Sequence, residues 1–145
     1  MEENKRKYTR FYSEFGKTIK LGVIEDSTNR KKLASLTRWH STWNSSEFIS
    51  LDDYITRMKK SQDQIYFFSG EDKAVLEKSP LVKGLVRKGY EILLCDDPID
   101  EYVFNTLREY SGKVLALIFR MLSMLEKETL SYLMMMRLRE RNKNT

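Results

Sequence analysis

Short apolar strands alternate with helical segments between residues 64 and 118, and this alternation constrains the fold more than any other feature of the chain. The three apolar runs are Ile65–Phe68, Tyr90–Cys95 and Val114–Ile118. Strands that are separated by helices pair in parallel and are joined by right-handed crossovers. We therefore expect an α/β fold in which residues 61–118 form a small three-layer α-β-α subdomain with a short, mainly parallel sheet.

Capping and turn residues indicate where the helices between these strands begin and end. One helix is expected over residues 71–78. Ser79-Pro80 begins the next helix, because proline at the first helical position loses no intrahelical hydrogen bond. Asp97-Pro98 begins a third helix, which we expect Gly112 to end, since glycine is the preferred residue just after a helix C-terminus.

Residues 1–60 are predicted to form a helical subdomain. Four aromatic residues near its start follow the i, i+3, i+4, i+7 spacing of one helical face: Tyr8, Phe11, Tyr12 and Phe15. Ile19, Val23 and Ile24 continue this apolar stripe beyond Gly16. The spacing therefore indicates that the first helix buries one aromatic face.

Further helices are expected in the rest of this N-terminal segment. A basic helix should cover residues 29–39, with Ser27 or Thr28 as its N-cap. Residues 40–47 are rich in serine and asparagine and indicate a loop. Ser50 is then expected to cap a short helix whose first turn holds two aspartates, where the helix dipole favours anions.

Residues 119–145 form an atypical basic tail that is rich in methionine and leucine. Five of the seven methionines lie beyond residue 120. A codon run that encodes Asp-Asp-Asp-Glu in one frame encodes Met-Met-Met-Arg in a neighbouring frame, and residues 134–137 have this sequence. We hypothesise that the chain is out of frame or mis-spliced from about residue 115 onward. The alternative is an amphipathic helix with one apolar side, formed by Leu122, Leu125, Leu130 and Leu133.

The charge distribution argues against several classes of protein. The net charge is +5, but residues 1–113 hold 20 basic and 18 acidic groups, so the body is close to neutral and is a poor match for a phosphate-binding surface. The single cysteine, Cys95, excludes a disulfide within the chain and is expected to be a buried small hydrophobe. The N-terminal residues do not resemble a signal peptide, and no window approaches the roughly 18 apolar residues of a membrane span.

No pattern in the sequence indicates catalysis or metal binding. One histidine, His40, and one cysteine provide no paired ligand spacing. A Ser-His-Asp triad would have to use that histidine, and the nucleophile-elbow and phosphate-loop motifs are absent. Paired carboxylates such as Asp96-Asp97 and Asp100-Glu101 follow strands or begin helices, where capping explains them. We therefore expect no catalytic, cofactor-binding or metal-binding residues.

Three features are candidates for contacts or modification. Arg30, Lys31 and Lys32 form a basic triplet that is either a solvated helix face or a docking patch for a partner. Trp39 and Trp43 flank a polar loop, where they either pack in the core or contact an unfolded client protein or a neighbouring domain. Asn44-Ser45-Ser46 fits the acceptor pattern for N-linked glycosylation, which requires entry into the secretory pathway.

A family resemblance rests on collinear motifs over residues 8–113. These include Phe11–Asp26 (F-x-x-x-F-G-K-x-I-K-L-G-x-x-E-D), Asn29-Arg30, Ser50–Tyr54, Lys88–Glu91 and Pro98–Tyr102. In this order they resemble the middle domain of the heat shock protein 90 family of molecular chaperones. The segments Val23–Asp26 and Lys88–Tyr90 are more similar to the endoplasmic-reticulum branch, the endoplasmins, than to the cytosolic branch.

The resemblance implies a helical coil followed by a small α-β-α subdomain. It implies that the chain is a truncated fragment of an ATP-dependent chaperone, in which this part relays the clamp cycle and contacts client proteins or co-chaperones. ATP and magnesium bind the family's N-terminal domain, so no family ATPase residue can be placed on this chain, and we expect the fragment to be no enzyme. The resemblance favours the endoplasmic reticulum lumen, with the cytoplasm as the alternative.

Other functions remain open from the sequence alone. The chain could act as a stand-alone protein-interaction module that binds clients or a full-length chaperone paralogue, or it could be a non-functional, pseudogene-like product. A nucleic-acid-binding protein that uses the basic triplet and residues 137–143 is less favoured, and a small α/β enzyme is the weakest alternative.

Overall fold

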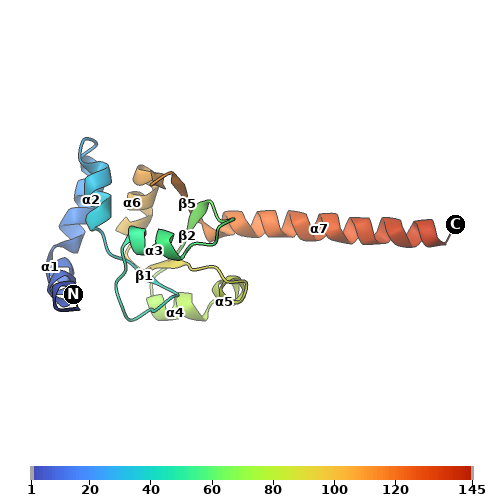
Figure 1. Ribbon diagram of the computed structural model, residues 1–145, viewed down its shortest axis with the longest axis horizontal. Helices are drawn as coiled ribbons and strands as arrows, with labels where there is room; N and C mark the ends of the chain where they lie inside the picture. The colour runs from blue at the N-terminus through green and yellow to red at the C-terminus, as the bar shows by residue number, and fades with distance from the viewer. Residues whose placement is uncertain (1, 145) are drawn as a thin grey trace.

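A computed structural model describes the backbone of residues 2–144 and the side chains of residues 3–118, 127 and 129–144. Helices and strands alternate along most of the chain (Figure 1). In chain order the elements are α1 (Glu2–Glu25), α2 (Arg30–Leu36), β1 (His40–Ser41), α3 (Leu51–Arg57), β2 (Gln64–Ser69), α4 (Lys73–Lys78), α5 (Pro80–Arg87), β3 (Leu93–Cys95), α6 (Ile99–Leu107), β4 (Glu109–Tyr110), β5 (Lys113–Leu117) and α7 (Ile118–Lys143).

The strands form one mixed sheet in the order β1-β3-β2-β5-β4. The central strand β2 pairs in parallel with both β3 and β5, while the two-residue edge strands β1 and β4 pair antiparallel. Parallel strands need crossover connections, and α4 with α5 and then α6 provide them. The prediction of an α/β fold with a short, mainly parallel sheet is therefore confirmed.

Side chains alternate between the two faces of the central strand, as the pleat of a β-strand requires. Ile65 and Phe67 join a buried cluster with residues of α1, α2, α3 and α6, whereas Tyr66 packs in a second cluster with Val82 and Leu85 of α5. Helices thus cover both faces. The first cluster runs across residue 60, and the division of the chain into subdomains at that position stays a prediction.

The first helix is longer than the aromatic motif that predicted it, and it buries only part of the predicted apolar stripe. Tyr12 and Val23 face the core, whereas Phe11 and Phe15 are about half exposed. Gly22 lies where α1 meets α2, and a Cβ at this position would approach the Leu33 side chain to 3.0 Å. Close contact between the two helices therefore depends on this glycine.

The second helix corrects the expected range of residues 29–39. It ends at Leu36, and Thr37 continues in extended backbone toward β1. Neither Ser27 nor Thr28 is its N-cap: Asn29 holds that position, while the Asp26 carboxylate accepts the backbone N–H groups of Thr28 and Asn29 at 3.1 Å. A carboxylate thus organises the turn between α1 and α2.

Two other expectations are corrected near the edges of the sheet. The predicted loop over residues 40–47 contains β1, whose two residues pair with Leu93 and Leu94. The third crossover helix ends at Leu107 rather than at Gly112, because Arg108 has a positive φ of 63°. Ser111 and Gly112, with φ of 49° and 76°, instead turn the hairpin between β4 and β5. Positive φ at both central residues is typical of a type I′ turn.

Residues 118–143 form the long helix α7, which projects from the body of the molecule (Figure 1). Of the four leucines expected on one apolar side, Leu130 and Leu133 are exposed, and the side chains of Leu122 and Leu125 lie outside the described residues. The hypothesis of an altered reading frame stays a prediction. Among the described residues, every helix is too short or too polar to pass through a lipid bilayer.

Candidate functional site

A buried ion pair joins α1 to α6. The Lys20 ammonium lies 2.7 Å from Oδ1 of Asp100, and the two side chains are only 14% and 4% exposed. The Lys20 ammonium also lies 4.8 Å from the centre of the Trp39 ring. Asp100 stands in the first turn of α6, so the pair fixes that turn directly against the inner face of α1. We call this arrangement the α1–α6 junction.

Electrostatics explain why these charges occur together in the core. Burial raises the pKa of Asp100, and the neighbouring ammonium limits this rise. Burial opposes the charged form of Lys20, but the charge and hydrogen bond of Asp100 outweigh it and raise the Lys20 pKa. A raised lysine pKa is the opposite of what a nucleophile or general base needs. The junction therefore has the properties of a structural connection rather than of a catalytic pair.

A second polar cluster holds the loop after β1. The Arg57 guanidinium donates to both carboxylate oxygens of Glu91 at 2.8 Å, and the Ser41 hydroxyl donates to the same carboxylate at 2.6 Å. Arg57 also lies over the ring of Trp43, 4.2 Å from its centre. A bidentate pair of this kind fixes orientation as well as distance. One side of the Trp43 ring is thus supported by Arg57, although the residue remains 53% exposed.

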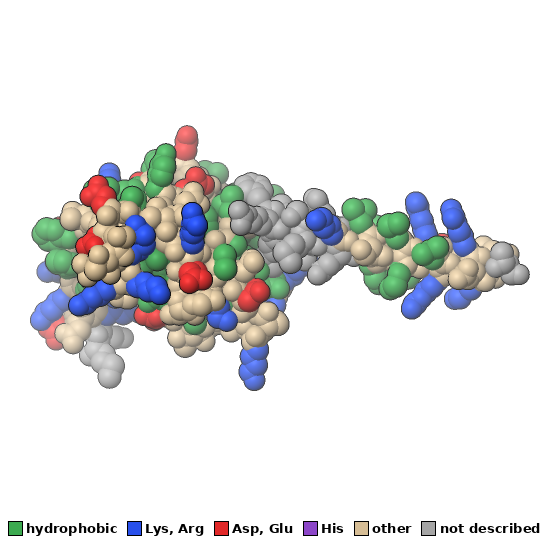
Figure 2. Space-filling model, turned by 90° about the horizontal axis from the view of Figure 1, so that it is seen from above, with side chains coloured by type: hydrophobic (Ala, Val, Ile, Leu, Met, Phe, Trp, Pro, Cys, Tyr) green, Lys and Arg blue, Asp and Glu red, His purple; other side chains and the backbone are tan. Residues whose placement is uncertain are grey.

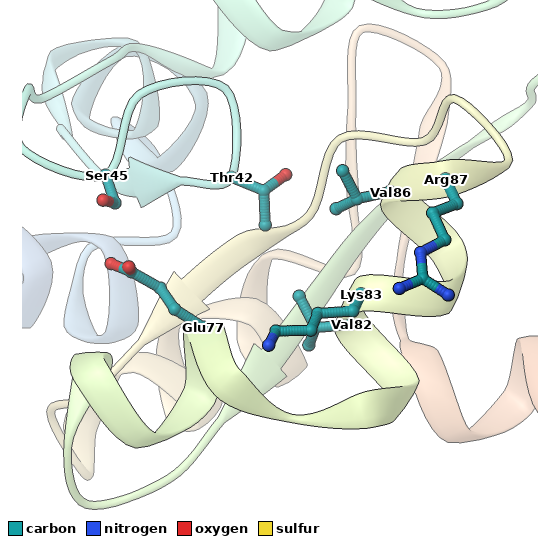
Figure 3. Close-up of a pocket in the computed structure, with 7 residues that line it drawn as sticks. All are labelled: Thr42, Ser45, Glu77, Val82, Lys83, Val86 and Arg87. Atoms are coloured by element: carbon teal, nitrogen blue, oxygen red, sulfur yellow. The ribbon is translucent and has the colours of Figure 1, made fainter.

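A pocket of about 460 Å³ lies between this loop and the helices α4 and α5 (Figure 3). Its lining residues, which we call the α5 groove, are Thr42, Ser45, Glu77, Val82, Lys83, Val86 and Arg87. A neighbouring pocket of about 320 Å³ shares Thr42 and Val86 with it and contains Trp43. The lining combines two valines with two basic groups, Lys83 and Arg87, and one acidic group, Glu77.

The predicted basic triplet is divided by the structure. Arg30 turns inward, where its guanidinium donates to the backbone carbonyls of Val23 and Ile24 at 2.7 and 3.1 Å. These carbonyls belong to the last turn of α1, so Arg30 caps that helix. Lys31 and Lys32 are exposed on α2. A docking role for the triplet stays a prediction, and two of its three side chains face solvent.

The two tryptophans have different environments. Trp39 is 2% exposed, its ring centre lies 4.4 Å from that of Phe104, and its indole N–H donates to the Thr37 hydroxyl. This burial removes Trp39 from the candidate contact surface, which retains Trp43. The Asn44 side-chain oxygen accepts the backbone N–H and the hydroxyl of Ser46 at 3.2 and 2.8 Å, so the glycosylation motif forms a local turn. Glycosylation itself stays a prediction.

His40 and Cys95 lack the environment of reactive groups. Burial, together with the charge of Lys73, lowers the pKa of His40, and its ring stacks on Phe48 with centres 4.3 Å apart. Burial raises the pKa of the Cys95 thiol, and the prediction that Cys95 is a buried hydrophobe is confirmed. Within the described residues, no group of three histidine, cysteine or carboxylate side chains is placed to hold a metal ion.

The α1–α6 junction was not predicted, although the sequence contains a signal for it. Lys20 follows Tyr12 by eight residues and precedes Val23 by three, so it lies on the same face of α1 as these two core residues. A charged residue on an apolar face needs a partner in the core. The sequence could not show which carboxylate is that partner, because Asp100 is distant along the chain.

Comparisons with known proteins agree on one family. The family model described as "Hsp90 protein" matches residues 1–137. The chain is 48% identical over 112 residues to an endoplasmin homolog of Arabidopsis thaliana and 47% identical over 113 residues to that of Hordeum vulgare. These matches cover 77% and 78% of the chain but 14% of each relative. Heat shock protein 83 of Leishmania donovani is 45% identical over 114 residues, which are 79% of the chain and 25% of that protein.

A solved structure shows the same fold. The middle domain of a Plasmodium falciparum heat shock protein superposes with a TM-score of 0.75 at 35% sequence identity, over 81% of this chain and 49% of that domain. The chain therefore spans about half of the middle domain it matches and a small part of the full-length relatives.

Proposed function

Because the chain belongs to the Hsp90 family of molecular chaperones and corresponds to part of the family's middle domain, we propose that it is a mechanical element that transmits motion from α1 to the sheet. The observation that carries this proposal is the buried ion pair between Lys20 and Asp100. A helix that is held by a paired buried charge cannot slide on its neighbour without exposing or separating the two charges.

The geometry of α1 suits this role. Its 24 residues give a rod about 36 Å long at 1.5 Å per residue. The junction at Lys20 and the Arg30 cap at Val23 both hold the C-terminal part of the rod. A displacement at the N-terminal end of α1 would therefore act on α6 and, through the first buried cluster, on β2.

The relay is testable in a full-length relative whose matching segment is replaced by residues 8–113 of this chain. Lys20→Met should slow ATP-driven closure of the clamp, measured by energy transfer between labels on the two subunits, while nucleotide affinity stays unchanged. Lys17→Met, an exposed lysine of the same helix, is the control. Unchanged closure kinetics in the Lys20→Met chimera would contradict the relay.

A second activity, contact with client proteins or co-chaperones, is favoured by the exposed Trp43 beside the α5 groove. Aromatic side chains that are both exposed and rigidly supported are typical of binding hot spots. Trp43→Ala should weaken the capture of an unfolded model substrate, measured as suppression of its light scattering. Tyr102→Ala, which removes a comparably exposed aromatic ring on α6, is the matched control and should leave capture unchanged. If both variants lose the same amount of capture, the substrate binds exposed aromatic side chains in general rather than a site at Trp43.

We propose that this part of the protein neither binds nor hydrolyses ATP, since its match lies in the middle domain, while Lys20 is held by Asp100 and His40 is stacked on Phe48. Micromolar binding of ATP in calorimetry would contradict this. We place the chain in the endoplasmic reticulum lumen, which the similarity to endoplasmin homologues supports, although the similarity to heat shock protein 83 is nearly as strong. An endoglycosidase-sensitive modification that is lost in Asn44→Gln would support the lumen.

A further inference from the structure

The projecting part of α7 exposes large apolar side chains without a cover from the described body of the protein (Figure 2). Six residues form what we call the α7 apolar segment: Leu130, Tyr132, Leu133, Met134, Met135 and Met136. Each is between 43% and 66% exposed. Surfaces of this kind on soluble proteins are usually interaction sites.

The distribution of these side chains around the helix axis distinguishes between a membrane surface and a protein as the partner. Successive helical residues are rotated by about 100°, so the six apolar positions point in all directions rather than along one stripe. A helix that lies in a membrane surface needs a sharp division between an apolar and a polar face. A helix that is apolar all round is normally enclosed by other protein segments. A protein partner that covers at least one side of the α7 apolar segment therefore fits it better than a membrane surface does.

The charges along α7 identify a partner that fits. Residues 137–143 carry four basic groups and one acidic group, while residues 124–130 carry two acidic groups and one basic group in the sequence. The apolar segment lies between these two charged stretches. A second copy of α7 in antiparallel orientation places each basic stretch beside the acidic stretch of the other copy. A parallel pair would place two strongly basic stretches side by side.

We propose that two copies of this chain associate through antiparallel packing of their α7 helices, with Leu133 of one copy opposite Met134 of the other. This register aligns residues 137–143 with residues 124–130 and brings the sides of the two helices that carry Leu130, Leu133 and Met134 together. The overlap of about 20 residues corresponds to about 30 Å of paired helix. The inference is independent of the relay and of client binding, because it uses no residue of the α1–α6 junction or of the α5 groove.

Sedimentation equilibrium of the full chain tests the association. The apparent mass should rise from 17.3 kDa toward about twice that value between roughly 1 and 100 μM, because a single helix pair buries little area. Leu133→Glu combined with Met134→Glu should remain monomeric over this range. Val75→Glu, at a residue of α4 that is 66% exposed, is the control and should dimerise as the wild type does. A wild-type chain that stays monomeric at 100 μM overturns the proposal.

Disulfide trapping tests the orientation. The native Cys95 is buried, so the unmodified chain should not cross-link. Leu133→Cys should form a covalent dimer on mild oxidation, whereas Lys143→Cys should not, because antiparallel packing separates the two ends. Efficient cross-linking through Lys143→Cys indicates parallel packing and overturns the proposal. Binding to anionic vesicles by the monomer, with no dimer in solution, would assign the segment to a lipid surface and would overturn it as well.

Discussion

Replacing Lys20 with methionine should strongly destabilise the protein while leaving the shape of the core nearly intact. Methionine fills a similar volume, so the main consequence is a buried carboxylate at Asp100 that has lost its partner. Breaking a buried pair from one side typically costs about 3–5 kcal/mol. The cost has an upper limit, because Asp100 can take up a proton instead of remaining charged.

This limit follows from the ordinary pKa of aspartate. Protonating a carboxyl group of pKa about 3.9 at pH 7 requires about 4 kcal/mol. The Lys20 side chain is 14% exposed, so water reaches the site and reduces the cost of leaving Asp100 without its partner. We therefore expect the free energy of unfolding to fall by about 3 kcal/mol at pH 7, within the typical range. At a urea m-value of about 2 kcal/mol/M, the midpoint of unfolding shifts by about 1.5 M.

Urea titrations followed by tryptophan fluorescence measure this shift, since Trp39 lies beside the ion pair. Lys5→Met, an exposed position on the same helix, should cost less than about 0.5 kcal/mol. Lys20→Met combined with Asp100→Leu should recover most of the loss, because an apolar pair avoids an unpaired buried charge. The deficit of the single variant should also shrink as the pH falls toward 4, where Asp100 becomes neutral. A deficit that is independent of pH, or no recovery in the double variant, would refute the electrostatic explanation.

Three further predictions concern caps, turns and pH. Ser50→Ala removes the hydroxyl that accepts the N–H of Asp53 at 3.0 Å, and the lost cap of α3 should cost about 1 kcal/mol in the same urea assay. Gly112→Ala should cost about 1–2 kcal/mol because of its positive φ alone, since no atom lies near the added Cβ; a neutral result would contradict the turn geometry. Burial raises the pKa of Tyr110 to about 12, so between about pH 10 and 12 the unfolded chain releases a proton that the folded chain retains. The free energy of unfolding should therefore fall as the pH rises through this range. In the Tyr110→Phe variant this fall should be shallower.

The fold was largely predictable because its central elements carry local signals. The apolar runs at β2 and β3 are flanked by turn residues, and a turn precedes the run at β5. Pro80 begins α5, and Ser50 with Asp53 forms a complete capping box. Each of these signals acts within a few residues. The similarity of motifs such as Pro98–Tyr102 to a known family then supplied the arrangement of the elements, which local patterns do not determine.

The wrong predictions concern places where contacts between residues far apart in the sequence override local conformational preference. Strand β1 has two residues, and its hydrogen bonds to β3 cannot be inferred from composition. The aromatic face of α1 was expected to point inward, but only Tyr12, which packs edge-on against Phe48, is buried, and Phe11 and Phe15 are half exposed. The end of α6 depends on the positive φ of Arg108, which no residue type favours strongly other than glycine.

The candidate site was the least predictable part. Asp100 looked like an ordinary acidic residue of a first helical turn, and its burial follows only from the packing of α1 on α6. Arg30 looked like a member of a solvated basic triplet, whereas the carbonyl groups at the end of α1 attract its guanidinium. Trp43 was also singled out from the sequence. Its place on the surface depends on Arg57 of α3, which lies over its ring, and on Glu91 before β3, which holds Arg57.

Amide hydrogen exchange of the wild type and of Lys20→Met tests most directly whether α1 and the sheet move as one body. In the wild type, the amides of residues 19–25 should exchange with the same protection as those of α6 and β2. In the Lys20→Met variant, residues 19–25 and the first turn of α6 should lose protection together, while β2 keeps more of it. Independent exchange of α1 in the wild type, faster than α6 by orders of magnitude, would contradict the mechanical coupling.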